Sequence, residues 1–266
     1  MSESKNEKIT QRLQVDYDLL ESMGYEVVGV FLQGSQNYRL ETDESDIDTK
    51  AIVLPTFDDF VLNGQAVSTT HILPSGEHID IKDIRVMFET MKKCNINFTE
   101  ILFTKYRRIN EKYADLLAPL FDNANNIAVW NKKLLYNSIS GMAMEKLKAL
   151  KHPYPIIVHK IKRFGYDPKQ LHHILRLEEF IVRLVGGESF ENCLISKDCE
   201  NLIAIKKGSL DLPTAEKMAH EFCEKIKNVR NLALEKGIDE LQDVVQIYDS
   251  VKVDILKKWF REQLIR

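Results

Sequence analysis

The sequence predicts an α+β fold, in which an N-terminal mixed sheet with helices is followed by an all-helical C-terminal domain. Short runs of β-branched and aromatic residues, which are typical of strands, occur in the first part of the chain, up to about residue 81. From residue 83 nearly to the end, apolar residues recur at the spacing of amphipathic helices. This change in pattern predicts an α/β half followed by a helical half.

The length and composition allow two domains. At 266 residues, of which 44% are hydrophobic, the chain can bury either one large core or two modest ones. A polar segment over residues 122–126 separates the two patterns. We therefore predict one domain over residues 1–117 and a helical domain over residues 118–266.

The charge and the cysteines limit the class of protein. The formal net charge is −3, so any site for a nucleic acid must be a local patch. The N-terminus has no apolar signal-peptide core, and no apolar run approaches the ~20 residues that span a bilayer. The cysteines lack metal-binding spacing and are predicted to be free thiols: Cys94, Cys193, Cys199 and Cys223. We expect a cytoplasmic protein with no membrane partner.

The predicted elements follow in order along the chain. A first helix ends near Gly24, which fits a C-terminal cap. Strands are predicted over residues 27–32, 51–54, 68–72 and 77–81, and a hairpin turn at 73–76 joins the last two. Asp83 is predicted to cap the next helix, because a periodic apolar run begins just after it. Longer helices are predicted over residues 130–150, 169–184, 212–236 and 240–264.

Between the first two strands lies a polar stretch from Gly34 to Asp48, GSQNYRLETDESDID. Asp46 and Asp48 are two residues apart at the entry to the second strand, so both carboxylates project to one face while Ile47 turns into the core. Carboxylates held side by side repel each other, and a hard divalent cation relieves that repulsion. Gly34 and Ser35 offer backbone N–H groups and a hydroxyl that could hold phosphate oxygens. An acidic solvated turn is the alternative interpretation.

Asp80 is the candidate for a third carboxylate. A site for two divalent ions uses about three carboxylates, one of which often comes from a neighbouring strand. In the strand over residues 77–81, His78 and Asp80 share one face while Ile79 and Ile81 take the other. The alternative is an acid on the surface of an edge strand.

A second concentration of charge lies in the helical half, where residues 146–176 contain many lysines, arginines and histidines but only one acid, Asp167. Such a stretch makes a local field suited to a triphosphate or a nucleic-acid backbone, although a lysine-rich face also serves solubility alone. The basic or chargeable residues that share one helix face, at offsets of three, four and seven, are Lys169, His172, His173 and Arg176. Near the acidic loop itself, the nearest basic residues in sequence are Arg39 and Lys50.

The ordered set of strand, Gly-Ser, loop, Ser-Asp-Ile-Asp and strand resembles the nucleotidyltransferase fold of the DNA polymerase beta superfamily. Together with the downstream run Gly165-Tyr166-Asp167-Pro168-Lys169 and the His and Arg that follow it, the chain looks like one branch of that superfamily. This branch holds the predicted nucleotidyltransferases associated with bacterial and phage RNA-repair gene sets. The resemblance spans residues 25–187. One departure is Arg39, where the family tends to have a small residue.

The resemblance implies a Mg²⁺-dependent transfer, with Mn²⁺ as a substitute, of a nucleoside monophosphate from an NTP such as ATP to an acceptor hydroxyl. Asp46, Asp48 and Asp80 would be the catalytic and metal-binding residues, and Gly34 and Ser35 would hold the phosphates. The other nucleotide-binding residues would be Lys169, His172, His173 and Arg176. An RNA end, a protein side chain or a small molecule would be the acceptor.

Other classes of protein fit the same residues. One is a nucleotidyltransferase of a toxin–antitoxin pair that modifies a partner protein. Another is a nucleotide- or RNA-binding protein that keeps the fold but has lost turnover. The absence of a third carboxylate would favour this second class. RNA binding without catalysis predicts metal-independent binding governed mainly by salt.

Overall fold

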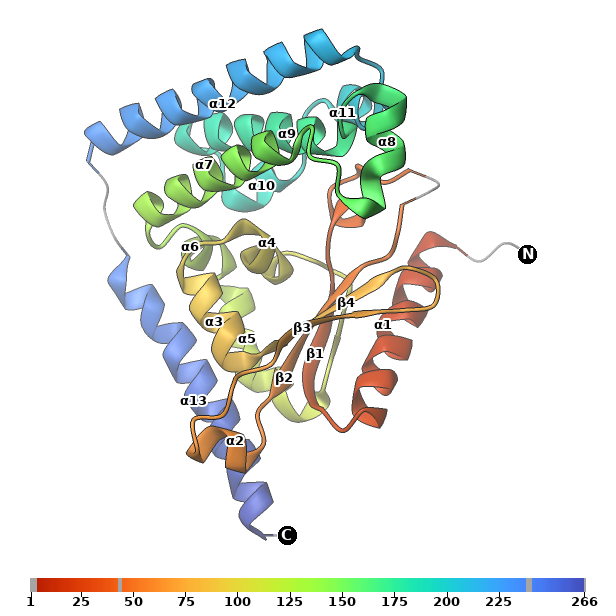
Figure 1. The fold of residues 1–266 in the computed structure, drawn as a ribbon. Helices are drawn as coiled ribbons and strands as arrows, with labels where there is room; N and C mark the ends of the chain where they lie inside the picture. The colour runs from red at the N-terminus through yellow and green to blue at the C-terminus, as the bar shows by residue number, and fades with distance from the viewer. Residues whose placement is uncertain (1–3, 43–44, 238–240, 266) are drawn as a thin grey trace. The chain divides into compact units, whose positions relative to one another are not determined.

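The computed structural model describes residues 4–42, 45–237 and 241–265. A mixed sheet with flanking helices is followed by a helical region, so the predicted α+β class is confirmed (Figure 1). The described residues form two compact units. The sheet unit contains residues 4–37, 45–130 and 241–265, and the helical unit contains residues 38–42 and 131–237. These units differ from the ranges 1–117 and 118–266 predicted from the sequence.

The sheet has five strands in the order β3-β4-β2-β1-β5. They are β1 (Glu26–Leu32), β2 (Thr49–Leu54), β3 (Ser68–Ile72), β4 (His78–Asp83) and β5 (Arg107–Ile109). β2 runs parallel to β4, and the other neighbouring pairs are antiparallel. The four strands expected from the sequence are present. β5 was not predicted, because three residues with two arginines carry no strand pattern.

One face of the sheet packs against α1 (Lys5–Ser22), as Figure 1 shows. Apolar side chains from α1 and from three strands form this core, with Leu20, Val30 and Ile79 fully buried. The helix begins with a capping box between Ser4 and Glu7 and ends at Ser22, with Met23 as its C-terminal cap. Gly24 has φ +88°, which agrees with the predicted glycine at the end of this helix.

The other face of the sheet packs against α3 (Ile84–Lys92), α5 (Ala114–Asp122) and α13 (Gln242–Ile265). Asp83 caps α3 as predicted, since its carboxylate accepts the Arg85 N–H at 2.8 Å. α13 reaches this core through Tyr248 and Ile255, which are fully buried. The last helix of the chain therefore belongs to the sheet unit, which is why the units do not follow the predicted boundary. The short helices here are α2 (Phe57–Val61), α4 (Ile96–Thr99) and α6 (Ala124–Ala128).

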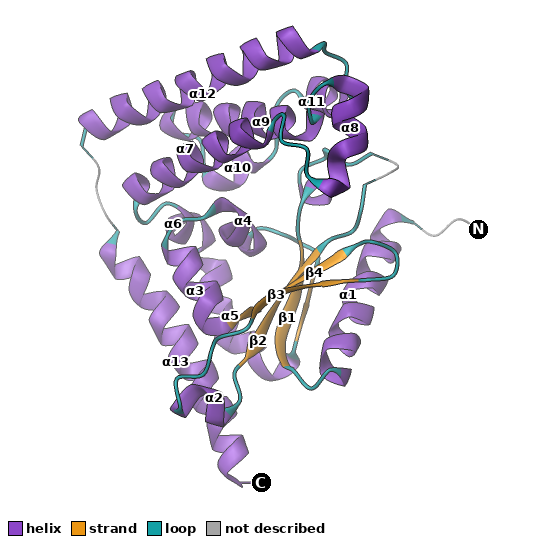
Figure 2. Cartoon of the chain, viewed as in Figure 1, coloured by secondary structure: helices purple, strands orange, loops and turns teal. Residues whose placement is uncertain are grey.

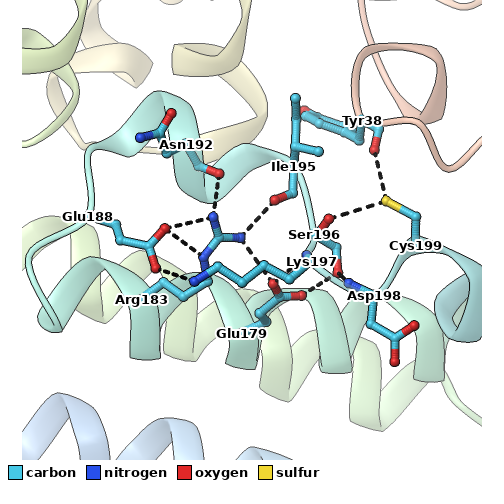
Figure 3. A network of polar contacts seen from close by, with 10 residues as sticks. All are labelled: Tyr38, Glu179, Arg183, Glu188, Asn192, Ile195, Ser196, Lys197, Asp198 and Cys199. Carbon is cyan, nitrogen blue, oxygen red and sulfur yellow. Dashed lines mark hydrogen bonds and ion pairs between the residues drawn. The ribbon is translucent and has the colours of Figure 1, made fainter.

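The helical unit is built around α9 (Pro168–Val185), which Figure 2 shows among the other helices. Asp167 caps α9 by accepting the Lys169 N–H at 3.1 Å. Its other helices are α7 (Lys132–Ala149), α8 (Val158–Phe164), α10 (Phe190–Leu194), α11 (Cys199–Lys206) and α12 (Leu212–Glu235). α9 contacts α7, α10, α11 and α12. Figure 3 shows how Arg183 of α9 joins its own helix to the next segment, by donating to Glu179, Glu188 and two backbone carbonyls. Every helix among the described residues is too short or too polar to cross a membrane.

Replacing Ile255 with alanine tests whether α13 supports the sheet unit. Ile255 is fully buried, so Ile255→Ala should lower the free energy of unfolding by about 2–5 kcal/mol. Both tryptophans of the chain, Trp130 and Trp259, lie in the sheet unit, so their fluorescence during urea unfolding reports on that unit. Val253→Ala, on the 41% exposed Val253 of the same helix, is the matched control and should change stability by about 0.5 kcal/mol or less. An unchanged tryptophan transition in Ile255→Ala would contradict the placement of α13.

Candidate active site

The Gly-Ser turn begins where β1 ends. Gly34 has φ +83°, a backbone conformation that glycine adopts without strain, and a single 3₁₀ turn follows at Ser35–Asn37. The Asn37 side chain holds this turn, because it donates to the Leu32 carbonyl at 2.8 Å and accepts from the Thr104 hydroxyl at 2.7 Å. Among the described residues, the Ser35 hydroxyl makes no hydrogen bond and is available to a ligand.

Backbone hydrogen bonds bring this turn against the Asp-Ile-Asp segment. Leu32 and Thr49 are the last pair of the β1–β2 ladder. Beyond them, the Gln33 N–H donates to the Asp48 carbonyl at 3.0 Å, and the Gln33 side-chain amide donates to the Thr49 carbonyl at 3.2 Å. The two motifs predicted from the sequence therefore meet at one edge of the sheet.

Asp46 and Asp48 lie in the segment just before β2, with their carboxylates accessible. Asp46 is exposed and, within the described part of the chain, has neither a hydrogen bond nor an ion pair. The Asp48 side chain is 30% exposed, and its Oδ1 accepts the backbone N–H of His78 at 3.0 Å. Ile47 packs against the core on the α1 side, as predicted. Of the other acids of the loop, Glu41 is partly buried, and Asp43 and Glu44 lie outside the described residues.

A polar network that was not predicted from the sequence holds the segment just before β2 in place. The Glu77 carboxylate accepts the Ile47 N–H at 3.1 Å and also binds Arg12. Arg12 in turn binds the buried Asp16 at 2.7 Å, and Asp16 accepts from the Thr49 hydroxyl at 2.6 Å. The sequence contains one sign of this network, since Arg12 and Asp16 stand four residues apart on the first helix and Asp16 falls among its apolar residues.

The same network shifts two pKa values. Burial opposes ionisation of Glu77, but hydrogen bonds from the Ile47 N–H, the Ser75 hydroxyl and Arg12 outweigh it and lower the pKa of Glu77. Burial raises the pKa of Asp16 despite its bonds to Thr49 and Arg12.

Asp80 has partners other than the metal that we expected. It lies opposite Lys50 in the parallel β2–β4 pair, and its Oδ2 accepts from Lys50 Nζ at 2.8 Å. Its Oδ1 lies 2.8 Å from Lys82 Nζ. Burial works against the charged form of Asp80, but the two lysines outweigh it and lower its pKa. Lys50 is 2% exposed, and its ammonium lies 3.8 Å from the centroid of the Phe98 ring.

These contacts decide which acids fit a metal ion. Asp46 and Asp48, two residues apart, offer accessible carboxylate oxygens, which is the donor chemistry that Mg²⁺ prefers. Both oxygens of Asp80 are already bound to ammonium groups. In the residues that the structure describes, no three Asp, Glu, His or Cys side chains converge on one point as a metal site. The residues therefore fit one ion at Asp46 and Asp48 and do not fit a second at Asp80.

The four residues of the downstream basic face differ in their surroundings. Lys169 is exposed at the start of α9. His172 is 2% exposed, and its Nδ1 lies 3.0 Å from the Leu202 carbonyl, so its ring belongs to the interior of the helical unit. Burial lowers the pKa of His172 to about 4 and also lowers the pKa of the partly buried His173. The other two residues of this face are a lysine and an arginine, Lys169 and Arg176.

Arg176 contacts the middle of the acidic loop. Residues 38–42 belong to the helical unit, and the Arg176 guanidinium lies 3.7 Å from the centroid of the buried Tyr38 ring. Lys206 Nζ donates to the Leu40 carbonyl at 2.9 Å, which holds the same segment. Between them, Arg39 is exposed and has φ +59°. The segment over residues 38–42 is therefore held within the helical unit by Arg176 and Lys206.

No model of a known protein family matches this chain, and no curated protein matches it. Among solved structures, the chain is similar to a nucleotidyltransferase-like protein from Exiguobacterium sibiricum 255-15. The identity is 14%, the likeness covers 96% of this chain and 79% of that chain, and the TM-score is 0.31. A likeness at this level carries no conclusion about the activity of this chain.

Replacing Glu77 with glutamine tests the network below the site. Because the pKa of Glu77 is lowered from 4.5 in the folded chain, its charge stabilises the fold above pH 4.5, and this stabilisation is lost as the pH falls through the lowered pKa. At pH 7, Glu77→Gln should lower the free energy of unfolding by about 1 kcal/mol or more, measured by tryptophan fluorescence. The difference from the wild type should shrink below pH 4.5.

The amide exchange of Ile47 gives a local check on the same network. Glu77→Gln should speed hydrogen exchange at the Ile47 N–H, because its acceptor loses its charge. Ser75→Ala is the matched control: it removes another donor to Glu77 but leaves the Ile47 bond in place. Equal exchange rates at Ile47 in the wild type and in Glu77→Gln would rule out this positioning role.

Proposed function

We propose that this protein is a Mg²⁺-dependent nucleotidyltransferase that transfers a nucleoside monophosphate from an NTP to an acceptor hydroxyl. One observation carries the proposal: the hydrogen bond from the Gln33 N–H to the Asp48 carbonyl, which sets the Gly34–Ser35 turn beside Asp46 and Asp48. A phosphate-binding turn next to a pair of accessible carboxylates is the arrangement that phosphoryl and nucleotidyl transfer require.

Each residue of this edge has a role in the proposal. Gly34 lets phosphate oxygens approach the backbone, since a side chain built there would project into open space. The Ser35 hydroxyl donates to a phosphate oxygen. Asp46 and Asp48 hold one Mg²⁺ or Mn²⁺, which when bound would offset the charge of the triphosphate. The His78 N–H fixes the orientation of the Asp48 carboxylate.

Lys169 and Arg176 supply the basic partners of the triphosphate in this proposal. Negative charge builds on the pyrophosphate leaving group during transfer, and fixed cations stabilise it. Arg176 lies against the Tyr38 ring of the same unit, and Lys169 is exposed. His172 has no such role, because its ring is buried against Leu202.

We propose an RNA end as the acceptor, and one surface favours RNA over a protein or a small molecule. The segment over residues 146–163 contains six lysines and arginines and no acid. Within it, the 51% exposed Tyr154 lies with its ring centroid 4.1 Å from that of His152. Basic side chains beside exposed aromatic rings suit a single-stranded nucleic acid, whose phosphates and bases they bind. Lys151 of this segment is paired with Glu216.

Label transfer from each NTP tests the proposed activity. Purified protein, Mg²⁺, a mixed RNA pool and each α-³²P-labelled NTP in turn should give labelled RNA with one of the nucleotides. Asp46→Asn and Asp48→Asn should each reduce transfer by about 100-fold or more, because the ion loses a ligand. Asp115→Asn, on an exposed aspartate of α5, should leave transfer unchanged. Full activity in both site variants would exclude this mechanism, and label on protein alone would identify a protein acceptor.

Valine at Gly34 tests the phosphate-binding turn. Gly34→Val places a β-branched residue at φ +83° and fills the space where phosphate would lie, so affinity for a fluorescent ATP analogue should fall by about tenfold or more. Ser35→Ala should weaken binding by about 1 kcal/mol, the value of one hydrogen bond. The control is Gly24→Val, which meets the same backbone strain at φ +88° and open space in the same unit, away from the turn. Nucleotide affinity that falls equally in Gly24→Val and Gly34→Val would assign the effect to stability alone.

A further inference from the structure

Four charged side chains alternate along two neighbouring strand ends beside the candidate site. The parallel register sets Lys50 opposite Asp80. Side chains two residues apart on a strand share a face, so Lys82 lies on the same face as Asp80. Asp48 stands one residue before β2, where its carbonyl continues the ladder by accepting the Gln33 N–H, and the same alternation sets it on the face of Lys50. This face thus carries two acids and two lysines, and Asp48 is the acid without a lysine partner among the described residues.

The carboxylate of Asp80 is fully used by the two lysines. Each of its oxygens lies 2.8 Å from an ammonium nitrogen, Oδ2 from Lys50 and Oδ1 from Lys82. One carboxylate and two ammonium groups leave a net positive charge at this point. A divalent cation brought there would meet two like charges at close range before it could reach a carboxylate oxygen.

Lys50 is held at this position by its burial and by its contact with Phe98. Its side chain is 3% exposed, and its ammonium lies over the Phe98 ring, which packs against the core formed by α3, α5 and α13. A buried ammonium that loses its carboxylate partner is strongly unfavourable, so Lys50 stays with Asp80. Lys82 is held as well, because it also donates to the Ser68 hydroxyl at 3.0 Å.

We propose that the Lys50 ammonium takes the place of a second metal ion beside Asp80, so that the site binds a single divalent cation, held by Asp46 and Asp48. This inference rests on the proposed function and deepens it. Asp80 is then a positioning residue: it holds the Lys50 ammonium on the face that carries Asp48, and it acts against the burial that lowers the pKa of Lys50. The charge at this position does not depend on the concentration of free metal.

Mn²⁺ binding tests the inference without any measurement of turnover. The probe is Mn²⁺, titrated into the full chain with and without the α,β-methylene analogue of ATP, and free Mn²⁺ is followed by electron paramagnetic resonance. Samples with the analogue alone give the Mn²⁺ that it binds without protein. The wild type should bind one protein-dependent Mn²⁺ per chain.

Two aspartate variants separate the ligand from the positioning residue. Asp80→Asn should keep Mn²⁺ affinity within about threefold of the wild type, whereas Asp48→Asn should weaken it by about tenfold or more. Lys50→Met keeps an unbranched stem against Phe98 but removes the charge, and it should let a second Mn²⁺ bind at Asp80. Circular dichroism and tryptophan fluorescence confirm that each variant is folded.

The outcomes distinguish this inference from the proposed function. Binding of two Mn²⁺ ions by the wild type would overturn the inference and leave the proposed function standing. A loss of Mn²⁺ affinity in Asp80→Asn as large as that in Asp48→Asn would do the same. A single Mn²⁺ on Lys50→Met would show that Lys50 does not replace a metal, and would also overturn it. Unchanged binding in both Asp46→Asn and Asp48→Asn, or no binding by the wild type under either condition, would overturn the function and the inference together.

Discussion

The hydrogen bond between the Gln33 N–H and the Asp48 carbonyl is the contact on which the candidate site depends. It continues the antiparallel β1–β2 ladder by one step beyond Leu32 and Thr49. The end of the loop at Asp48 therefore lies beside its start at Gln33. A slip of one residue in this register would turn Ile47 outward and both aspartates toward the α1 core. Glu77 and His78 oppose that slip, because they bind the N–H of Ile47 and the carboxylate of Asp48.

The three aspartates differ in how their charges are balanced, and this difference separates their roles. Asp80 is neutralised inside the protein by Lys50 and Lys82. Asp46 and Asp48 have no lysine or arginine partner among the described residues, and the nearest basic group to Asp48 is the His78 ring, whose Nδ1 lies 3.7 Å from Asp48 Oδ1. Asp46 and Asp48 thus keep accessible oxygens beside the Gly34–Ser35 turn, where a cation can bind.

Local sequence patterns were enough to predict β1, β2, the hairpin, the Asp83 cap and the two motifs of the loop, because each depends on residues close in sequence. The parts that could not be predicted depend on distant pairs. The β2–β4 register that joins Lys50 to Asp80, and the packing of α13 on α3 and α5, leave no mark in the periodicity of either segment. His172 has the spacing of an exposed basic face, yet its ring is buried in the helical unit. Its Nδ1 lies 3.0 Å from the carbonyl of Leu202, which belongs to another helix.

A crystal structure with Mn²⁺ and a non-hydrolysable NTP analogue would test the central claim most directly. Anomalous scattering locates the ion without reference to activity. The account predicts a Mn²⁺ peak within about 2.5 Å of oxygens of both Asp46 and Asp48, with the triphosphate against Gly34 and Ser35 and the Lys50–Asp80 pair intact. A Mn²⁺ ion bound elsewhere in the chain, with the triphosphate away from the Gly34 turn, would contradict it.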